Sequence, residues 1–180
     1  MNLIVAHCRN RGIGFEKKLP WMLSKDMKRF KDLTIGKGKN AVIMGRNTWL
    51  SLPLKYRPLP KRENIILTTK LVQNQHNNNM HFLSSLSAAE EYCISTKIDD
   101  SWIIGGEMLY KESLQSTFLK KIYVTHIDKD YDCDTFFPEI PDCFALDSKT
   151  DWMIENNTPY RYELYTRKKY IENPGLYFAK

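Results

Sequence analysis

The residue best suited to chemistry in this sequence is Asp26, an acid on the apolar face of a predicted helix. Ser24 is the expected N-cap, because the periodic apolar residues begin just after it. Spacings of three and four residues place Asp26 on a stripe of apolar side chains, namely Leu23, Phe30 and Leu33, with Met27 beside them. An unpaired carboxylate buried in such a stripe is strongly destabilising, so Asp26 needs a partner or a raised pKa.

Two interpretations of Asp26 follow from the residues alone. In the first, the acid lies in the first helical turn, where the helix dipole favours it, and points to solvent beside Lys25 and Arg29. In the second, it faces a cleft and binds a cationic or amidine-like group of a ligand. The preceding segment Leu19-Pro20-Trp21 supports the second interpretation, because a rigid proline beside a large aromatic can form a cleft wall. Both remain open at this point.

Two junctions of strand, glycine and helix predict a phosphate-binding site. Residues 41–44 run into Gly45-Arg46-Asn47-Thr48, and residues 102–104 run into Gly105-Gly106-Glu107-Met108. A helix N-terminus offers free N–H groups and a positive dipole end to a phosphate, and Arg46 adds a forked donor. Each junction is also readable as a tight turn, and the chain has no G-x-G-x-x-G motif or P-loop, so an ordinary Rossmann site is not indicated. Two such junctions together favour a nucleotide with separated phosphates.

Arg62 is a third candidate, because it follows the stiff segment Pro58-Leu59-Pro60-Lys61. A guanidinium that is held in place by such a segment can clamp a carboxylate in a bidentate pair. Taken alone, a surface arginine is the simpler interpretation, and the residues themselves do not decide between the two.

Composition and charge limit the classes of function. The 180 residues carry a net charge of +6, which suits an anionic partner such as nucleic acid or a small phosphate or carboxylate compound. The basic residues are spread along the chain without interleaved aromatics, so nucleic acid is not the expected partner. No apolar run approaches the roughly 20 residues that span a bilayer, and residues 1–7 lack a signal-peptide pattern. We therefore expect a cytoplasmic protein without a membrane partner.

No metal site is expected. The cysteines show neither a C-x-x-C pair nor a nearby histidine cluster, which argues against zinc and against a disulfide framework. Scattered, reduced thiols of small buried residues are the simplest interpretation of Cys8, Cys93, Cys133 and Cys143.

Short apolar runs alternate with helical patterns, which predicts an α/β fold in one domain over residues 1–180. We expect a mostly parallel central sheet of about eight strands with flanking helices, followed by a C-terminal antiparallel hairpin over 160–166 after a turn at 156–159. Ser87 to Glu90 reads as a capping-box helix start, and 108–114 as a further helix. The Asn-rich residues 73–79 are expected to form a loop. The predicted strands include 3–6, 41–44, 64–69, 102–104 and 121–127.

In their order and spacing, these segments resemble the dihydrofolate reductase family from Leu3 to about Arg167. Each piece is modest alone, but the series is highly specific. The matching pieces are Ile13-Gly14, Leu19-Pro20-Trp21, Asp26 with Phe30, Val42 to Trp49, Arg57-Pro58-Leu59-Pro60 with Arg62, Ile104-Gly105-Gly106 with Tyr110, Val124 to Ile127, and Asp134 to Pro138.

The resemblance implies a site for dihydrofolate. Asp26 would hydrogen-bond the 2-amino and ring nitrogens of the pteridine and promote protonation at N5 through a water, with Thr125 supporting it. Arg62 would clamp the glutamate α-carboxylate, and Trp21 would belong, with Ile13, to a loop that closes over the nicotinamide. The other substrate-binding residues that it implies are Val5, Ala6, Leu23, Phe30, Leu52, Leu59, Ile104 and Tyr110.

The resemblance also implies NADPH as cofactor, bound at the two glycine junctions. Thr69 and Ser85 stand where vertebrate-like members carry arginines for the 2′-phosphate, and Lys70 is the residue that would compensate. The cofactor-binding residues that it implies are Ala6, Ile13, Gly14, Gly45, Arg46, Asn47, Thr48, Thr68, Thr69, Lys70, Ile104, Gly105, Gly106, Glu107, Met108 and Tyr110.

The expected activity is therefore reduction of dihydrofolate to tetrahydrofolate, which supports one-carbon metabolism and thymidylate synthesis. One alternative is a riboflavin-pathway reductase of the same fold, which needs neither an acid after Leu-Pro-Trp nor Arg62. The other is a non-catalytic folate- or nucleotide-binding relative, and the presence of Asp26 and Thr125 argues against it. A monomer is expected, with fusion to or association with thymidylate synthase left open.

Overall fold

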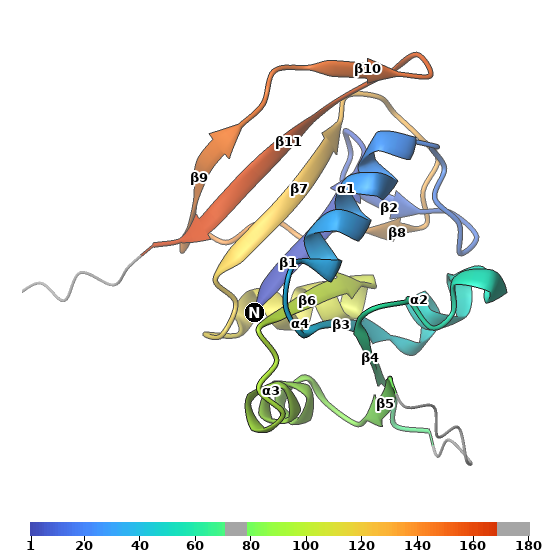
Figure 1. Cartoon of the computed structure of the whole chain (residues 1–180). Coiled ribbons are helices and arrows are strands. Elements are labelled where there is room, and N and C mark those ends of the chain that lie inside the picture. Colours follow the sequence, from blue (N-terminus) through green and yellow to red (C-terminus); the bar gives the residue numbers. More distant parts are fainter. Residues whose placement is uncertain (71–78, 169–180) are drawn as a thin grey trace, which may run out of the picture.

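The computed structural model of the chain describes residues 1–70 and 79–168 (Figure 1). Within these residues, nine strands form the main sheet in the order β10–β11–β7–β1–β6–β3–β4–β5, with β9 paired to β11. A second sheet pairs β2 (Gly12–Gly14) with β8 (Thr135–Phe136). The strands of the main sheet are β1 (Asn2–His7), β3 (Asn40–Gly45), β4 (Glu63–Leu67), β5 (Met80–Leu83), β6 (Asp100–Gly105), β7 (Lys121–Ile127), β9 (Phe144–Lys149), β10 (Met153–Glu155) and β11 (Thr158–Arg167).

Parallel pairing dominates the middle of the main sheet. β1 lies parallel between β6 and β7, and β3 lies parallel between β6 and β4. β11 runs antiparallel to β7, β9 and β10. The chain turns between β10 and β11 at Asn156 and Asn157, whose φ angles of 50° and 54° are tolerated well by asparagine. The predicted mostly parallel sheet with a C-terminal antiparallel hairpin is confirmed.

Helices cover both faces of the sheet (Figure 1). They are α1 (Ser24–Ile35), α2 (Arg46–Ser51), α3 (Leu86–Ser95) and α4 (Glu107–Gln115), with a 3₁₀ turn η1 (Leu54–Tyr56) after α2. None of the helices in residues 1–70 and 79–168 has the length and apolar character that crossing a bilayer requires.

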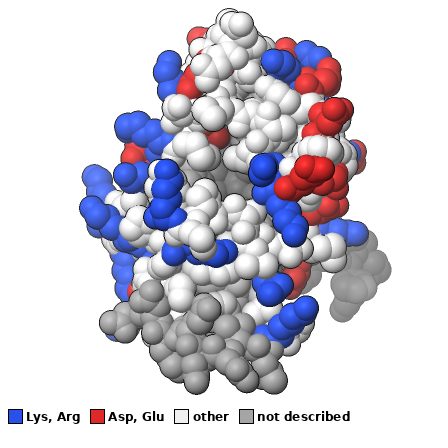
Figure 2. All heavy atoms as spheres, turned by 90° about the vertical axis from the view of Figure 1, so that its right-hand side faces the viewer, with Lys and Arg blue, Asp and Glu red and all other residues white. Residues whose placement is uncertain are grey.

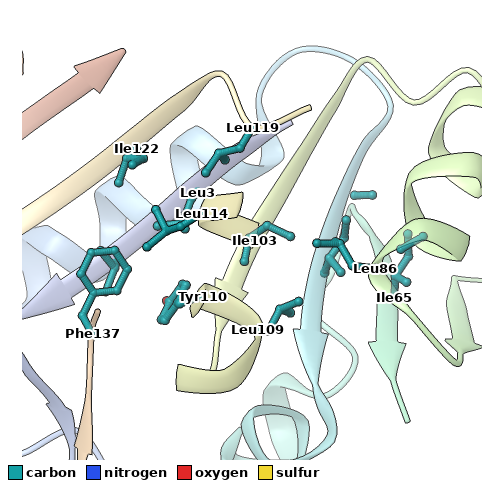
Figure 3. Close-up of a cluster of buried hydrophobic side chains, with 14 of the residues drawn as sticks. Leu3, Ile65, Leu86, Ile103, Leu109, Tyr110, Leu114, Leu119, Ile122 and Phe137 are labelled. Atoms are coloured by element: carbon teal, nitrogen blue, oxygen red, sulfur yellow. The ribbon is translucent and has the colours of Figure 1, made fainter. Parts of the chain in front are cut away.

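Alternation of side chains along the strands produces two separate cores. Leu3 and Val5 of β1 point to the face that α3 and α4 cover, whereas Ile4 between them points to the face of α1 and α2. Figure 3 shows the first of these cores, where Leu109 of α4 packs beside Ile103 of β6. The second core lies between α1 and the sheet, and several of the candidate site residues pack against it.

Two predicted helix starts are wrong by one or two residues. The N-cap of α1 is Leu23 rather than Ser24, and it offers no side-chain hydrogen bond, because a residue from a distant hairpin binds the first N–H groups instead. The N-cap of α3 is Ser85 rather than Ser87, because Leu86 is buried in the core and must belong to the first turn. Of the predicted loop over 73–79, residues 73–78 lie outside the described residues.

Candidate active site

The two glycine junctions and Asp26 lie near the edge of the sheet at which the parallel strands end, whereas Arg62 immediately precedes β4 and so lies at the opposite edge. Because β1, β3 and β6 run in the same direction, their carboxyl ends share one edge, and Gly45 and Gly105 are the last residues of β3 and β6. Ligand sites of open α/β sheets occur at such an edge. Figure 2 views this side of the molecule and shows a hollow near its centre, with Lys and Arg side chains along the rim.

Asp26 points into the protein. The residue is 6% exposed, and Thr125 Oγ1 of β7 donates a hydrogen bond of 2.6 Å to its Oδ1. Burial raises the pKa of the Asp26 carboxyl, although the Thr125 hydrogen bond and the charge of Arg29 act in the opposite direction. The solvent-facing interpretation of Asp26 is therefore wrong. A carboxyl in this setting keeps its proton to a higher pH than an exposed one and can donate it to a bound group.

The start of α1, and with it Asp26, is fixed by the C-terminal hairpin. The backbone N–H groups of Ser24 and Lys25 donate hydrogen bonds of 2.6 and 3.2 Å to the carboxylate of Glu155 in β10. The next residue, Asn156, donates from Nδ2 to the carbonyl of Met22 at 3.0 Å. A carboxylate at this end also suits the positive end of the helix dipole. Sequence reasoning missed this contact, which joins residues 131 positions apart.

Arg62 is a buried cation near the far end of α1. It is only 5% exposed, so the surface-arginine interpretation is wrong. Its Nη1 donates to Thr34 Oγ1 at 2.6 Å and its Nε to the Pro60 carbonyl at 3.0 Å. No carboxylate among the described residues pairs with it, and burial lowers the pKa of Arg62 to about 10. A desolvated guanidinium with unused donors is a strong site for an incoming anion.

Half-buried apolar side chains line the α1 side of the sheet. Phe30, Leu52 and Ile104 pack against the cluster that contains Leu59, and the Arg62 guanidinium lies 5.9 Å from the Phe30 ring centre. A third cluster, near the start of α1, holds three of the predicted residues, Ala6, Trp21 and Leu23, together with Tyr160 of β11. Partly covered apolar surfaces of this kind suit the faces of a flat ring.

Two predicted substrate residues belong to the opposite core. Val5 and Tyr110 pack in the cluster under α3 and α4, where Tyr110 is 5% exposed. The Tyr110 hydroxyl donates to the Ile4 carbonyl at 2.9 Å, so this donor already has a backbone acceptor. The structure therefore does not group these two side chains with Phe30 and Leu59.

The two glycine junctions lie against each other. A Cβ built on Gly45 would lie 3.8 Å from both the Gly105 carbonyl oxygen and the Gly106 nitrogen. The helices that follow, α2 and α4, have no side-chain hydrogen bond at their N-caps within the described residues, so both helix starts present free N–H groups. This small, donor-rich cradle fits a ligand with two linked phosphates. The structure thus brings the two junctions together, and their role in binding a phosphate stays a prediction.

Gly105→Ala is expected to lower the free energy of unfolding by about 1–3 kcal/mol, the usual cost of a strained backbone conformation. Gly105 has a φ of 123°, and an added Cβ would lie 3.3 Å from Thr48 Oγ1. Urea unfolding measures the effect. Gly14→Ala is the matched control, because a Cβ there would lie 3.4 Å from its nearest neighbour, an ordinary contact. Equal stability of Gly105→Ala and the wild type would contradict the prediction.

Residues of the predicted closing loop are held in place by the segment before β8. Ile13 and Gly14 lie in β2, and the Gly14 carbonyl accepts from the Asp134 N–H at 3.0 Å. The backbone N–H of Glu16 donates to Asp134 Oδ2 at 2.8 Å. Trp21, at the end of this loop, is buried, with its ring 5.5 Å from that of Tyr131. Whether the loop closes over a ligand stays a prediction.

The residues predicted to select the cofactor follow β4. Thr68 is half-buried, whereas Thr69 and Lys70 are exposed, and Thr68 Oγ1 accepts from the Lys70 N–H at 3.2 Å. Ser85 is engaged in capping α3, where its hydroxyl accepts from the Ala88 N–H at 3.1 Å.

Sequence reasoning also missed Thr34, which is fully buried and accepts from Arg62. A signal was present, because Thr34 follows Asp26 by eight residues and such spacings return to the same side of a helix. Asp134 and Glu155 gave no comparable signal, since their partners depend on how distant strands meet.

Comparison with known proteins agrees with this site. A family model described as "Dihydrofolate reductase" matches residues 1–169. The dihydrofolate reductase of Aedes albopictus is 39% identical over 180 residues, which cover 92% of this chain and 96% of that protein. The enzyme of Schistosoma mansoni is 39% identical over 181 residues, with coverages of 92% and 95%.

One of the similar proteins is longer. The bifunctional dihydrofolate reductase-thymidylate synthase of Daucus carota is 36% identical over 177 residues, which cover 92% of this chain and 33% of that protein. The match thus extends over nearly the whole length of this chain in stand-alone and fused relatives alike. Together with the buried acid and the paired glycine junctions, it shows that the chain belongs to the dihydrofolate reductase family.

Proposed function

We propose that the protein reduces 7,8-dihydrofolate to 5,6,7,8-tetrahydrofolate with NADPH and so supports one-carbon metabolism and thymidylate synthesis. The observation that carries the proposal is the buried Asp26, held by Thr125, on the same helix that ends beside the unpaired cation Arg62. An acid and a cation at two ends of one apolar wall match a ligand with a nitrogen heterocycle at one end and a carboxylate at the other.

The pteridine end of the substrate would bind at Asp26. The carboxyl group accepts from ring N–H and amino donors, and its Thr125 hydrogen bond fixes the orientation of the second oxygen. Because burial raises the pKa of Asp26, the group can retain a proton and promote protonation at N5 of the pteridine through a bridging water. Only one such acid is needed, because the reduction requires a single proton from the protein side.

The other end of the substrate would bind at Arg62. Thr34 Oγ1 and the Pro60 carbonyl orient the guanidinium, so that its remaining N–H groups can clamp the glutamate α-carboxylate in a bidentate pair. Phe30, Leu52, Leu59 and Ile104 would contact the aromatic rings between the two ends.

The cofactor would be held at the paired junctions, with Gly45 to Thr48 and Gly105 to Met108 presenting backbone N–H groups to its pyrophosphate. When bound, NADPH supplies the hydride. Ile13, Gly14 and Trp21 would exclude water from the reacting rings. Arg46, Thr68, Thr69 and Lys70 would favour the 2′-phosphate, since Ser85 is occupied as a helix cap.

Loss of absorbance at 340 nm on mixing the pure protein with NADPH and dihydrofolate is the expected result.

Because only Arg46 and Lys70 offer a full charge to the 2′-phosphate among the predicted residues, we expect kcat/KM for NADPH to exceed that for NADH by less than a thousandfold. Lys70→Ala should lower the ratio of kcat/KM for NADPH to that for NADH further. Lys97→Ala, which removes an exposed lysine after α3, should leave this ratio unchanged. A protein that oxidises neither cofactor in the presence of dihydrofolate would contradict the proposed function.

A further inference from the structure

Arg29 is a half-buried cation one helical turn after Asp26 on α1. Its guanidinium lies 4.0 Å from the centre of the Tyr162 ring and 5.9 Å from that of Tyr123. Among the described residues, its buried Nη1 has no hydrogen-bond partner, and no carboxylate pairs with the guanidinium directly. The charge of Arg29 is therefore not cancelled by contact, and it acts through space on the nearby Asp26.

Neighbouring residues of the strand pair β7–β11 contact the side chains of Asp26 and Arg29. Thr125 of β7 is the register partner of Tyr162 of β11. Thr125 binds the Asp26 carboxyl, and the Tyr162 ring carries the Arg29 guanidinium. Two features of the fold thus fix the distance between Asp26 and Arg29: their spacing along α1, and their contacts with paired residues of the sheet.

Glu155 is the second charged group at this end of α1. Its carboxylate binds the N–H groups of Ser24 and Lys25, just before Asp26 in the chain. The other groups that face Asp26 are Thr125 of β7 and two tyrosines of β11, Tyr160 and Tyr162. Burial raises the pKa of both tyrosines, so they stay neutral in the working range. Arg29 and Glu155 are therefore the charges that decide the field at Asp26.

We propose that Arg29 and Glu155 are positioning residues of opposite sign that tune the proton affinity of Asp26 and so set the pH range in which the site delivers its proton. The inference rests on the proposed function, in which Asp26 is the proton donor. In this role each residue acts through Asp26.

The direction of each effect follows from its charge. The Arg29 cation favours the ionised carboxylate and lowers the pKa of Asp26, whereas the Glu155 anion disfavours it and raises that pKa, both on top of the larger upward effect of burial. In the proposed reaction the protonated carboxyl is the active form, so the hydride-transfer rate falls as pH rises through this pKa. Removing Arg29 should move the fall to higher pH, and removing the charge of Glu155 should move it to lower pH.

The test compares Arg29→Met, Arg29→Lys, Glu155→Gln and the wild type. Methionine keeps most of the packing volume without the charge, lysine keeps the charge, and glutamine keeps an acceptor for the Ser24 and Lys25 N–H groups. The readout is the single-turnover rate with NADPH and dihydrofolate against pH, because slow product release hides the chemical step in kcat. We expect an upward shift of about one pH unit for Arg29→Met, a smaller downward shift for Glu155→Gln, and little change for Arg29→Lys.

A packing defect lowers the rate at every pH and leaves the midpoint unmoved, so shifts of opposite sign identify the electrostatic role. Unmoved midpoints, or shifts of the same sign, overturn the inference.

A second measurement is independent of activity: the ¹³C signal of the Asp26 carboxyl, assigned by its absence from Asp26→Asn, is titrated in the protein without ligands. If Arg29→Met does not fold, the sign of the Glu155→Gln shift decides. A wild type without reductase activity but with these NMR shifts would refute the proposed function and leave the tuning of Asp26 intact.

Discussion

Asp26→Asn lowers turnover at pH 7 by a factor on the order of 10²–10⁴, the range expected when a general acid is lost. Asparagine has nearly the same shape and can still accept the 2.6 Å hydrogen bond from Thr125, but it has no proton to give. The loss therefore isolates proton delivery from packing. Steady-state assays at saturating NADPH measure it, and Asp32→Asn is the matched control, because Asp32 lies on the same helix but is exposed and paired with Lys28.

The deficit of Asp26→Asn narrows as the pH falls. Acidic solvent protonates a growing share of dihydrofolate before it binds, so the variant then needs no acid of its own. A ratio of wild-type to variant rates that decreases steadily from pH 8 to pH 5 is the expected profile. Unchanged turnover at pH 7 would remove Asp26 from the mechanism, and the proposed function would lose its main support.

The fold of Asp26→Asn should be at least as stable as that of the wild type at pH 7. Burial raises the folded-state pKa of Asp26, so between the unfolded and the folded pKa the folded protein binds more protons than the unfolded chain. Stability therefore falls as pH rises through this window, and the ionised acid is destabilising above it. Asparagine removes this effect. Thermal unfolding of both proteins at pH 7 tests the sign and shows that lost activity is not lost structure.

The place of Asp26 on the apolar stripe of α1 was predictable because it depends on local geometry. Helical periodicity alone places the acid on the stripe with Phe30 and Leu33, which packs on the face of the sheet, but it left open whether the carboxyl faces a cleft or solvent. The parallel strands and glycine junctions were predictable for the same reason, since apolar runs and the residues that end them are read within a few positions.

Contacts between distant segments were not predictable in this way. The pairing of Glu155 with the start of α1 requires the hairpin to reach over β7, which no pattern near residue 24 encodes. Serine capping shows a milder form of the same limit. Ser85 and Ser87 are equally good N-caps locally, and only the burial of Leu86 decides between them.

The burial of Arg62 lies between these cases. The rigid Pro58-Leu59-Pro60 segment suggested a fixed guanidinium, but the choice between solvent and interior depended on Thr34 of α1, which supplies a buried acceptor at 2.6 Å. The contact between α1 and the segment before β4 thus converts a surface residue into a desolvated cation.

Arg62→Leu raises KM for dihydrofolate by about a hundredfold, which corresponds to the ~3 kcal/mol expected of a lost charged hydrogen bond. Leucine fills much of the buried volume but offers no donor to the glutamate α-carboxylate. Because Arg62 binds a part of the substrate that does not react, kcat at saturation should be nearly unchanged. Arg62→Lys should give an intermediate KM, since an ammonium group keeps the charge but not the bidentate geometry.

The matched control for Arg62→Leu is Lys61→Asn, which removes the adjacent exposed charge at a φ of 61° that asparagine tolerates. Its KM should remain that of the wild type. A substrate without the glutamate moiety, such as a dihydropterin, completes the comparison of two proteins with two substrates, because it has no carboxylate for Arg62 to bind. For that substrate Arg62→Leu and the wild type should have equal kcat/KM. A hundredfold loss with both substrates would mean that Arg62 supports the shape of the site, whereas a loss confined to dihydrofolate assigns the carboxylate to this guanidinium.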